Sequence, residues 1–316
     1  VAIYFRQHGE RTYYDTISHQ FYNQLLAYYK FSSGMDIGER TKPQNGSMHL
    51  QHIKKRFDLR LSTLPIQHTE SLAIRILPHD QIYTLDELFL FPYQCETIKQ
   101  LLSNQSGVIL FTGPTGCGKS TTMYAILEAL LEKDPYQVIT LEDPIERKIP
   151  RLLQVQMNDQ AGITYHTGLK AALRHDPDIL MVGEIRDHEV AKFVFEVALT
   201  GHLVISTLHA QHSIGTIHRL INMGVSKEDI EHSLIAVCSN ELLPIRRGAQ
   251  TVRRAAILEI LHGEPLQKAL NGKLDNTITL KNSFDHLRKK AYAYGFISEN
   301  ELYERTSFPI TSRIAN

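Results

Sequence analysis

The sequence predicts an α/β protein, in which a small α+β domain precedes a larger domain built on an open parallel sheet. Two observations predict this class. Between residues 107 and 206, short apolar runs with little alternation are separated by helical stretches, as in strands buried on both faces of a parallel sheet. Before residue 78, apolar and polar residues alternate, which is typical of antiparallel strands with one exposed face. The 316 residues are enough for two domains with separate cores.

The first domain is expected over residues 1–77. Strands are predicted at 2–5 and 11–17, on either side of a turn at 8–10. A helix follows, because five apolar residues recur at helical spacing: Phe21, Leu25, Leu26, Tyr28 and Tyr29.

Two further strands of this domain are predicted after a turn at 43–46. The runs 57–61 and 72–76 each place apolar residues on one face and an arginine on the other. These arginines are Arg60 and Arg75. One interpretation is that they are ordinary solvent-facing strand residues.

Residues 78–92 are expected to form a linker, and residues 93–316 the second domain. Four segments of that domain are predicted to be buried parallel strands: 107–112, 137–141, 179–182 and 203–206. From about residue 213 the chain is expected to be mostly helical, with one strand candidate at 255–261.

Charge and cysteine content exclude some classes of protein. Lys plus Arg and Asp plus Glu both number 34, so direct nucleic-acid binding, which usually goes with a basic surplus, is not expected. Cys95, Cys117 and Cys238 are far apart, which fits a reducing compartment better than a disulfide framework.

No apolar run approaches the roughly 20 residues that span a bilayer. No signal peptide is visible either, although the chain begins with Val1. A cytoplasmic location is expected.

A phosphate-binding loop is predicted at residues 113–120, because GPTGCGKS matches G-x-x-x-x-G-K-[ST] in full. Its glycines let backbone N–H groups turn inward around the phosphates. Lys119 is expected to reach the β- and γ-phosphate oxygens, and the Ser120 hydroxyl to bind Mg²⁺. An accidental match is disfavoured, because a buried strand precedes the loop and an amphipathic helix follows it. We therefore expect eight residues to bind ATP: Gly113, Thr115, Gly116, Cys117, Gly118, Lys119, Ser120 and Thr121.

Acidic residues follow two of the predicted parallel strands, Glu142 and Asp143 after one and Glu184 after another. Ligands of open α/β sheets bind at the carboxyl ends of the strands. There, one carboxylate can hold Mg²⁺ and a second can polarise the attacking water. An acid in this place also commonly caps the next helix, but the phosphate loop favours catalysis. His209, after the fourth strand, either senses the γ-phosphate or is a hydrogen-bonded structural histidine.

Four ordered stretches resemble the secretion and pilus ATPase superfamily: GPTGCGKSTT, ITLEDPIE, DPDILMVGEIRD and TGHLVISTLHA. They are similar to its Walker A motif, Asp box, Walker B motif and His box. Upstream, FDLRLSTLP and SLAIRIL resemble the family's N-terminal domain. The resemblance extends from about residue 1 to about residue 245. It implies a RecA-like P-loop ATPase domain, a PAS-like N-terminal α+β domain and a helical C-terminal part.

The resemblance also implies roles for five catalytic candidates. Glu142 matches the Asp-box acid, our candidate for orienting or activating water, and Glu184 matches the Walker B glutamate, with Mg²⁺ as its partner. The division of labour between these two acids stays open. Arg60 and Arg75 match arginines that move in to meet the γ-phosphate, where a guanidinium neutralises developing charge. His209 lies in the His-box stretch.

For the assembly, the resemblance implies a homo-oligomeric ring, usually a hexamer. ATP would lie between the two domains of one subunit and the surface of a neighbour. The implied partner is a membrane platform protein of a pilus machine. The location then expected is peripheral, at the inner face of the cell membrane.

Departures from the family's usual motifs indicate which of its subfamilies the chain most resembles. The chain lacks the tetracysteine motif of many assembly-type members, so no zinc is expected. Residues 238–243 do not keep the usual Gln-Arg-Leu tract, and the tail lacks a signature of retraction motors. Such a chain most resembles the competence pseudopilus ATPases of Gram-positive bacteria. The predicted function is ATP-driven assembly of that filament, or a related type II/IV filament, in support of DNA uptake.

The sequence leaves three alternative functions. A nucleotide-dependent scaffold or switch, acting through partners with little turnover, is the main alternative. A DNA or RNA motor is disfavoured by the neutral charge and by the absence of an aromatic and basic stripe. A small kinase is disfavoured by the Asp-box and His-box stretches.

Overall fold

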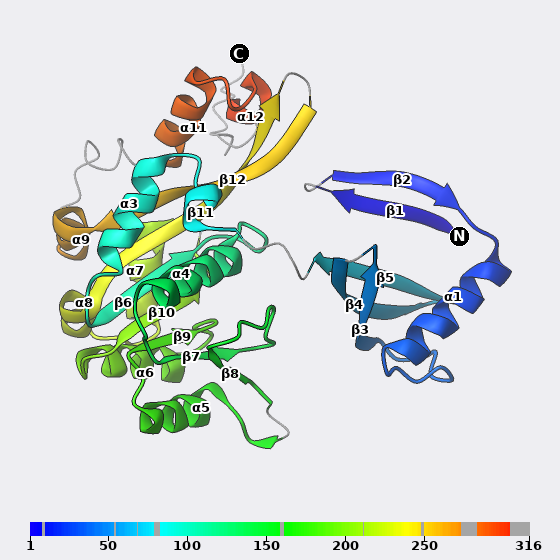
Figure 1. Cartoon of the computed structure of the whole chain (residues 1–316), viewed down its shortest axis with the longest axis horizontal. Helices are drawn as coiled ribbons and strands as arrows, with labels where there is room; N and C mark the ends of the chain where they lie inside the picture. The colour runs from blue at the N-terminus through cyan, green and yellow to red at the C-terminus, as the bar shows by residue number, and fades with distance from the viewer. Residues whose placement is uncertain are drawn as a thin grey trace, which may run out of the picture. The chain divides into compact units, whose positions relative to one another are not determined.

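The computed structural model describes residues 1–7, 10–53, 55–67, 69–78, 83–158, 161–210, 212–247, 250–272 and 283–303. The chain divides into two compact units, Val1–Ile82 and Tyr83–Asn316 (Figure 1). The boundary lies inside the stretch 78–92 that was expected to be a linker, and each unit is described separately below.

The first unit is a small α+β structure, as predicted. It begins with a hairpin of two antiparallel strands and a helix that the Ser18 hydroxyl caps. A three-stranded antiparallel sheet in the order β3-β4-β5 follows. The elements are β1 (Ala2–Gln7), β2 (Glu10–Thr16), α1 (His19–Ser32), β3 (Gln44–His52), β4 (Lys55–Ile66) and β5 (Thr69–Pro78).

The core of this unit is small and includes a buried ion pair. Met35, Leu59 and Leu61 form a buried apolar cluster, and Tyr22 and Leu26 of α1 are buried as well. The Lys30 ammonium on α1 lies 2.6 Å from a carboxylate oxygen of Glu70 on β5 and donates to the Glu39 carbonyl. Both side chains of the pair are almost fully buried, at 1% and 3% exposure. The pair therefore ties the helix to the sheet.

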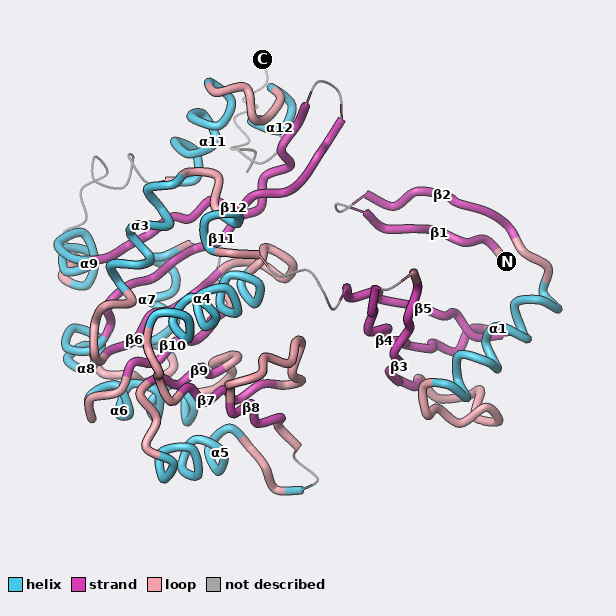
Figure 2. Tube along the Cα trace, viewed as in Figure 1, coloured by secondary structure: helices cyan, strands magenta, loops and turns pink. Residues whose placement is uncertain are grey.

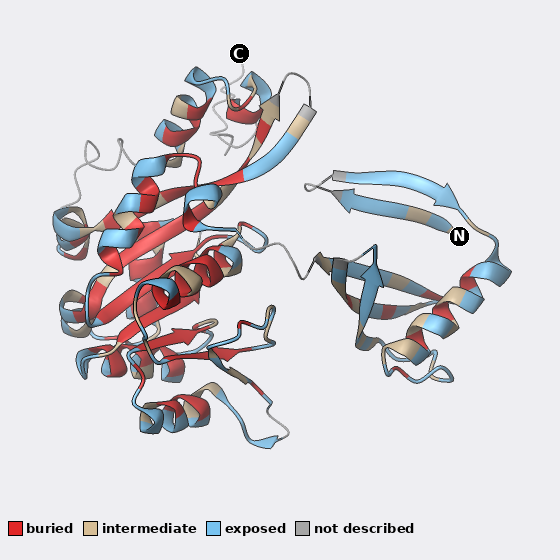
Figure 3. Cartoon of the chain, viewed as in Figure 1, coloured by how far each residue is buried: buried red, intermediate tan, exposed pale blue. Residues whose placement is uncertain are grey.

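The second unit is built on a seven-stranded sheet in the order β12-β11-β6-β10-β9-β7-β8. Every neighbouring pair is parallel except β11 and β12, which form an antiparallel hairpin. Figure 3 shows that the central strands are buried. The strands are β6 (Gly107–Thr112), β7 (Val138–Glu142), β8 (Leu153–Gln156), β9 (Ile179–Val182), β10 (Leu203–Leu208), β11 (Leu234–Arg247) and β12 (Gln250–His262).

Helices pack on both faces of this sheet (Figure 2). Successive residues of β6 point to opposite faces, so Val108 and Leu110 pack with α5 to α9, whereas Ile109 and Phe111 pack with α2, α3 and α4. The helices are α2 (Leu85–Leu88), α3 (Pro92–Leu101), α4 (Lys119–Lys133), α5 (Tyr165–Ala172), α6 (His188–Leu199), α7 (Ser213–Asn222), α8 (Lys227–Ser233), α9 (Gly263–Leu270), α11 (Phe284–Ala293) and α12 (Glu299–Tyr303). No helix in the described part of the chain is both long and apolar enough to cross a membrane.

The C-terminal part differs from the expectation of a mostly helical segment after residue 213. Helices α7, α8, α9, α11 and α12 are there, but residues 234–262 form the long hairpin of β11 and β12. Polar residues interrupt the apolar pattern of β11, and neighbouring helices supply partners for them. Asn240 donates to Thr122 on α4, and Glu241 pairs with Arg288 on α11. The expected strand at 255–261 lies inside β12.

Candidate nucleotide-binding site

The phosphate loop and three of the predicted site residues lie along one edge of the large sheet. In the parallel part of the sheet the strands lie in the order β6, β10, β9, β7. The loop follows β6, His209 follows β10, Glu184 lies two residues after β9, and Glu142 ends β7. Because the carboxyl ends of parallel strands meet at one edge, these groups form one row. The His209 Nε2 atom lies 3.3 Å from Glu184 Oε1, which shows how close neighbours in the row are.

The loop has a backbone that only glycine adopts easily. Gly113, Gly116 and Gly118 have φ angles of 137°, 82° and 98°, in the left-handed half of the map. A Cβ on Gly113 would lie 2.8 Å from the Asn240 carbonyl oxygen, so the loop packs closely against β11 there. A Cβ on Gly116 would meet nothing within 4 Å. The loop therefore leaves open space beside Gly116, as a phosphate cradle requires.

Lys119 and Ser120 begin α4, directly after the loop. The Lys119 ammonium donates to the carbonyls of Gly113, at 2.7 Å, and Pro114, at 3.1 Å. It is held inside the turn, where an entering phosphate would replace one of these carbonyls. Ser120 is partly buried and Thr121 is exposed. The remaining ATP-binding candidates lie in the loop, with Thr115 and Gly116 exposed and Cys117 buried.

Glu142 is buried, with only 4% of the residue exposed. Thr140 donates to Oε1 at 2.6 Å and Gln154 donates to the same oxygen at 3.1 Å. The Tyr124 hydroxyl donates to Oε2. Three donors thus surround the carboxylate, which suits an ionised side chain that can only accept hydrogen bonds.

Arg186 links two further acidic residues at the same edge, Asp143 and Glu184, into a network. Its guanidinium lies 2.8 Å from Asp143 Oδ2 and 3.3 Å from Glu184 Oε2. The other oxygen of Glu184 faces His209. Side chains of this network are 27–49% exposed, so they are open to a ligand in a way that Glu142 is not.

Arg60 and Arg75 belong to the first unit, where they are direct partners across β4 and β5. Residues directly opposite in an antiparallel pair point to the same face, and like charges there repel. Neither arginine has an ion pair with a carboxylate among the described residues. The two guanidinium groups are therefore available to an anion.

These features agree with the comparisons with known proteins. The family model described as "Type II/IV secretion system protein" matches residues 1–281. The chain belongs to the type II/IV secretion system protein family. It is 39% identical to competence protein ComGA of Bacillus subtilis over 296 residues, which are 89% of this chain and 83% of that protein. It is also 40% identical to competence protein ComGA of Halalkalibacterium halodurans over 320 residues, 96% of this chain and 90% of that one.

One solved structure and one further sequence relative support the same assignment. A crystal structure of the pilus retraction motor PilT with bound ADP matches with a TM-score of 0.74 and 26% identity, over 97% of this chain and 90% of that one. The type IV pilus assembly ATPase PilB of Thermus thermophilus is 38% identical over 85% of this chain, which corresponds to 32% of PilB. The expectations of a RecA-like fold, of membership in a secretion and pilus ATPase family and of a resemblance to competence ATPases are confirmed.

The residues of this family member fit Mg²⁺, the metal that nucleotide hydrolysis implies. Mg²⁺ prefers carboxylate and hydroxyl oxygens together with phosphates. Ser120 offers a hydroxyl at the start of α4, and Glu184 offers a partly exposed carboxylate on the same edge. These two side chains would hold the ion.

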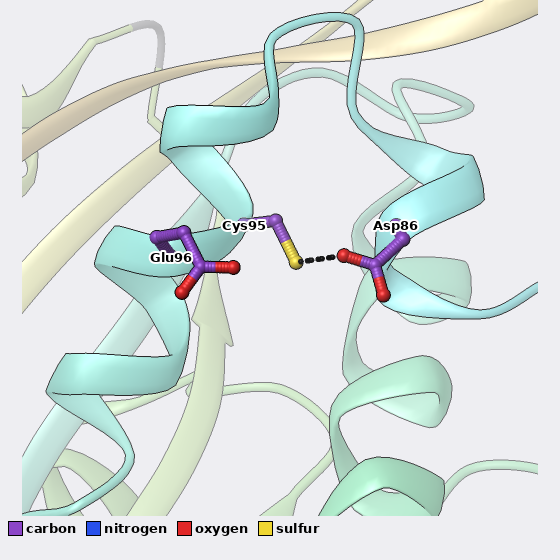
Figure 4. A group of neighbouring side chains, drawn as sticks. All are labelled: Asp86, Cys95 and Glu96. Carbon is purple, nitrogen blue, oxygen red and sulfur yellow. Dashed lines mark hydrogen bonds between the residues drawn. The ribbon is translucent and has the colours of Figure 1, made fainter.

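One other cluster has the composition of a metal site but is already neutralised. Asp86, Cys95 and Glu96 place three ligand atoms within 4.8 Å of one another (Figure 4). The Lys99 ammonium, however, lies 3.2 Å from Asp86 and 3.5 Å from Glu96. Burial, with the hydrogen bond to Asp86, raises the pKa of the Cys95 thiol to about 11, so it stays protonated. Lysine thus already supplies the positive charge that a metal ion would bring.

Local sequence patterns do not single out Thr140, Tyr124, Gln154 or Arg186 as residues of the site. Arg186 stands two residues after Glu184, and this spacing beside an acidic strand end could have indicated it. Tyr124 lies within the apolar face of α4, where an aromatic residue is expected in any core. Gln154 is on β8, a strand that was not predicted.

Proposed function

We propose that the chain is the ATP-hydrolysing motor subunit of a competence pseudopilus or related type II/IV filament, and that it supports DNA uptake. The observation that carries the proposal is the row of groups along one sheet edge: the phosphate loop, His209, Glu184 and Glu142. Family membership and similarity to competence proteins support the choice of filament.

In this proposal the chain's own groups divide the work of hydrolysis. Lys119 leaves the loop carbonyls and binds the β- and γ-phosphate oxygens, and the loop N–H groups hold the phosphates. Arg60 and Arg75 neutralise charge on the γ-phosphate. Mg²⁺, when bound, neutralises charge on the phosphate oxygens. His209, paired with Glu184, is suited to respond to the occupancy of the site.

Glu142 is proposed to orient the attacking water and accept its proton. The water oxygen forms a bond to the γ-phosphorus while the bond from that phosphorus to the β–γ bridging oxygen breaks, releasing ADP and phosphate. Three side-chain donors surround Glu142 in this structure. A carboxylate has about four acceptor sites, so these three donors leave one of them for the attacking water. A buried carboxylate that gains access to water only in the active state would limit idle hydrolysis.

The proposed assembly is a homo-oligomeric ring, a hexamer by analogy with the family. It would act on a membrane platform protein and so lie peripherally at the inner face of the cell membrane. ATP binding and release would swing the first unit against the second, with residues 78–92 as the hinge region. The neutral net charge supports contact with protein partners rather than with nucleic acid.

Replacement of the chain by variants in its own cell tests this function. Lys119→Ala and Glu142→Gln should abolish both filament assembly and DNA uptake while the proteins remain at normal levels. Lys133→Ala, at the exposed far end of α4, and Glu132→Gln are matched controls that should leave uptake unchanged. Normal uptake with Lys119→Ala would overturn the proposal.

A further inference from the structure

Tyr124 connects the helix of the phosphate loop to the proposed catalytic carboxylate. It lies on α4, five residues after Lys119, and only 6% of it is exposed. Its hydroxyl donates to Glu142 Oε2. The Tyr124 hydroxyl oxygen in turn accepts hydrogen bonds from the backbone N–H groups of Glu146, at 3.1 Å, and Arg147, at 3.3 Å. All the hydrogen-bonding capacity of the phenol is therefore used within the Asp-box region.

The groups around this phenol are themselves fixed. Gln154, which donates to Glu142, also donates to the Arg147 carbonyl at 2.8 Å and accepts from the Ile149 N–H at 2.8 Å. The Arg147 guanidinium lies 2.8 Å from Glu128 on α4 and over the Tyr124 ring. The loop after β7 is thus attached to α4 through Tyr124 and through Glu128.

This arrangement makes the position of one carboxylate oxygen depend on α4. Thr140 on β7 and Gln154 on β8 both donate to Oε1. In the sheet, β10 and β9 separate these two strands from β6, the strand that precedes the phosphate loop. Among the described residues, Tyr124 is the side chain of α4 that binds Glu142, and it binds the other oxygen. Burial, followed by the nearby Glu142 charge, raises the pKa of Tyr124, so the phenol remains a donor at physiological pH. A tyrosine that only fills the core needs one acceptor for its hydroxyl, and any backbone carbonyl could be that acceptor. The Tyr124 hydroxyl instead donates to the proposed catalytic carboxylate.

We propose that Tyr124 is a positioning residue for ATP hydrolysis, whose hydroxyl sets the orientation of the Glu142 carboxylate relative to the phosphates held at the start of the same helix. The proposal rests on the proposed function, because it takes Glu142 to be the group that handles the attacking water. Loss of the hydroxyl should slow the chemical step and leave nucleotide binding intact, because the hydrogen-bond partners of this hydroxyl are Glu142, Glu146 and Arg147, all outside the phosphate loop.

The test compares Tyr124→Phe, Glu142→Gln and the double variant in the full chain, by steady-state ATP turnover and by binding of a non-hydrolysable ATP analogue. Tyr124→Phe keeps the ring in its core and should lower kcat about 10-fold to 100-fold, the range for a misplaced catalytic group. The KM for ATP and the Kd of the analogue should change less than about twofold. The double variant should be no slower than Glu142→Gln, within about twofold, since two groups that act as a unit are not additive. Tyr93→Phe removes a hydroxyl from the same unit away from Glu142 and should behave as the wild type.

Each other outcome has a distinct meaning. An unchanged or raised kcat for Tyr124→Phe, or a double variant slowed by the product of the two single effects, would overturn the positioning role. A parallel rise of KM and of the analogue's Kd would also overturn it, since that would show a structural effect on the phosphate loop. Full turnover by Glu142→Gln would instead contradict the proposed role of Glu142 itself. Thermal melting of each variant confirms that the compared proteins are folded.

Discussion

Glycine residues of the phosphate loop are required for two different reasons. Gly113 has a φ of 137° and its missing Cβ leaves room for Asn240 and Cys117, whereas Gly116 has a φ of 82° beside open space. The first glycine is needed for packing of the loop against the sheet, and the second for access of the ligand. Sequence alone assigns both to one motif and does not separate these roles.

Alanine substitutions should separate them. Gly113→Ala should lower the free energy of unfolding by roughly 2–4 kcal/mol, because it combines an unfavourable φ with a contact to backbone that cannot move freely. Gly116→Ala should cost only about 1–2 kcal/mol, the cost of a left-handed non-glycine residue, while still weakening ATP binding. Urea denaturation measures both. Equal losses of stability would show that the packing at Gly113 does not matter.

At the same scale, the sequence predicted residues that lie inside a motif and missed those that act across elements. Lys119, Ser120, Glu184 and His209 were predicted because loops and strand ends are recognisable in the chain. The donors on Glu142 come from α4, β7 and β8 and meet only in the folded sheet. Their partners are set by tertiary packing, which no local pattern encodes.

Among the elements, α1 and β5 are held together by the buried pair of Lys30 and Glu70. Lys30→Met should destabilise the first unit by about 3–5 kcal/mol, because it leaves the Glu70 charge buried without a partner. The double variant Lys30→Met/Glu70→Leu should recover most of that loss, since an apolar pair has no charge to desolvate. Lys42→Met, at an exposed position, is the control. Chemical denaturation of the full chain, followed by a probe in the first unit, gives the values, and no recovery in the double variant would contradict the interpretation.

The contact between α12 and β11 should depend on pH. Burial acts to raise the pKa of Glu301, but the Ser298 N–H and Arg246 overcome it, so the pKa is lowered. A lowered folded-state pKa contributes stability that is present above the unfolded value, about 4.3, and is lost as pH falls through the folded value.

Glu301→Gln should therefore cost roughly 1.5–3 kcal/mol at pH 7, the value of hydrogen bonds to a charged group. The difference from the wild type should shrink as the pH falls below about 4.3. Unfolding free energies measured across this range test the sign. A difference that grows on acidification would refute the assignment.

Elements buried on both faces were the ones that the sequence predicted well. The four parallel strands beside the phosphate loop have continuous apolar runs, and all four are present. β11 was not predicted, because Ser239, Asn240 and Glu241 break its apolar pattern. Their partners on α7, α4 and α11 are distant in sequence, so the strand is stabilised by contacts that a local pattern does not contain.

For the whole molecule, the central claim is that the sheet edge hydrolyses ATP within a ring. The order of strands brings together groups that are separated by almost a hundred residues, from Lys119 to His209. Two arginines of the first unit, Arg60 and Arg75, lie on one face of its sheet and have no ion pair with a carboxylate among the described residues. Because the proposed motor acts as a ring, oligomeric state and turnover belong in one experiment.

That experiment measures ATP turnover and native mass together for the wild type, Lys119→Ala and Glu142→Gln. The account predicts turnover by a ring-sized wild-type species and its loss, by at least about 100-fold, in both variants. Lys119→Ala should also bind ATP weakly, whereas Glu142→Gln should still bind it. A monomer that binds ATP, with negligible turnover that Glu142→Gln does not change, would contradict the motor and favour a nucleotide-dependent scaffold or switch.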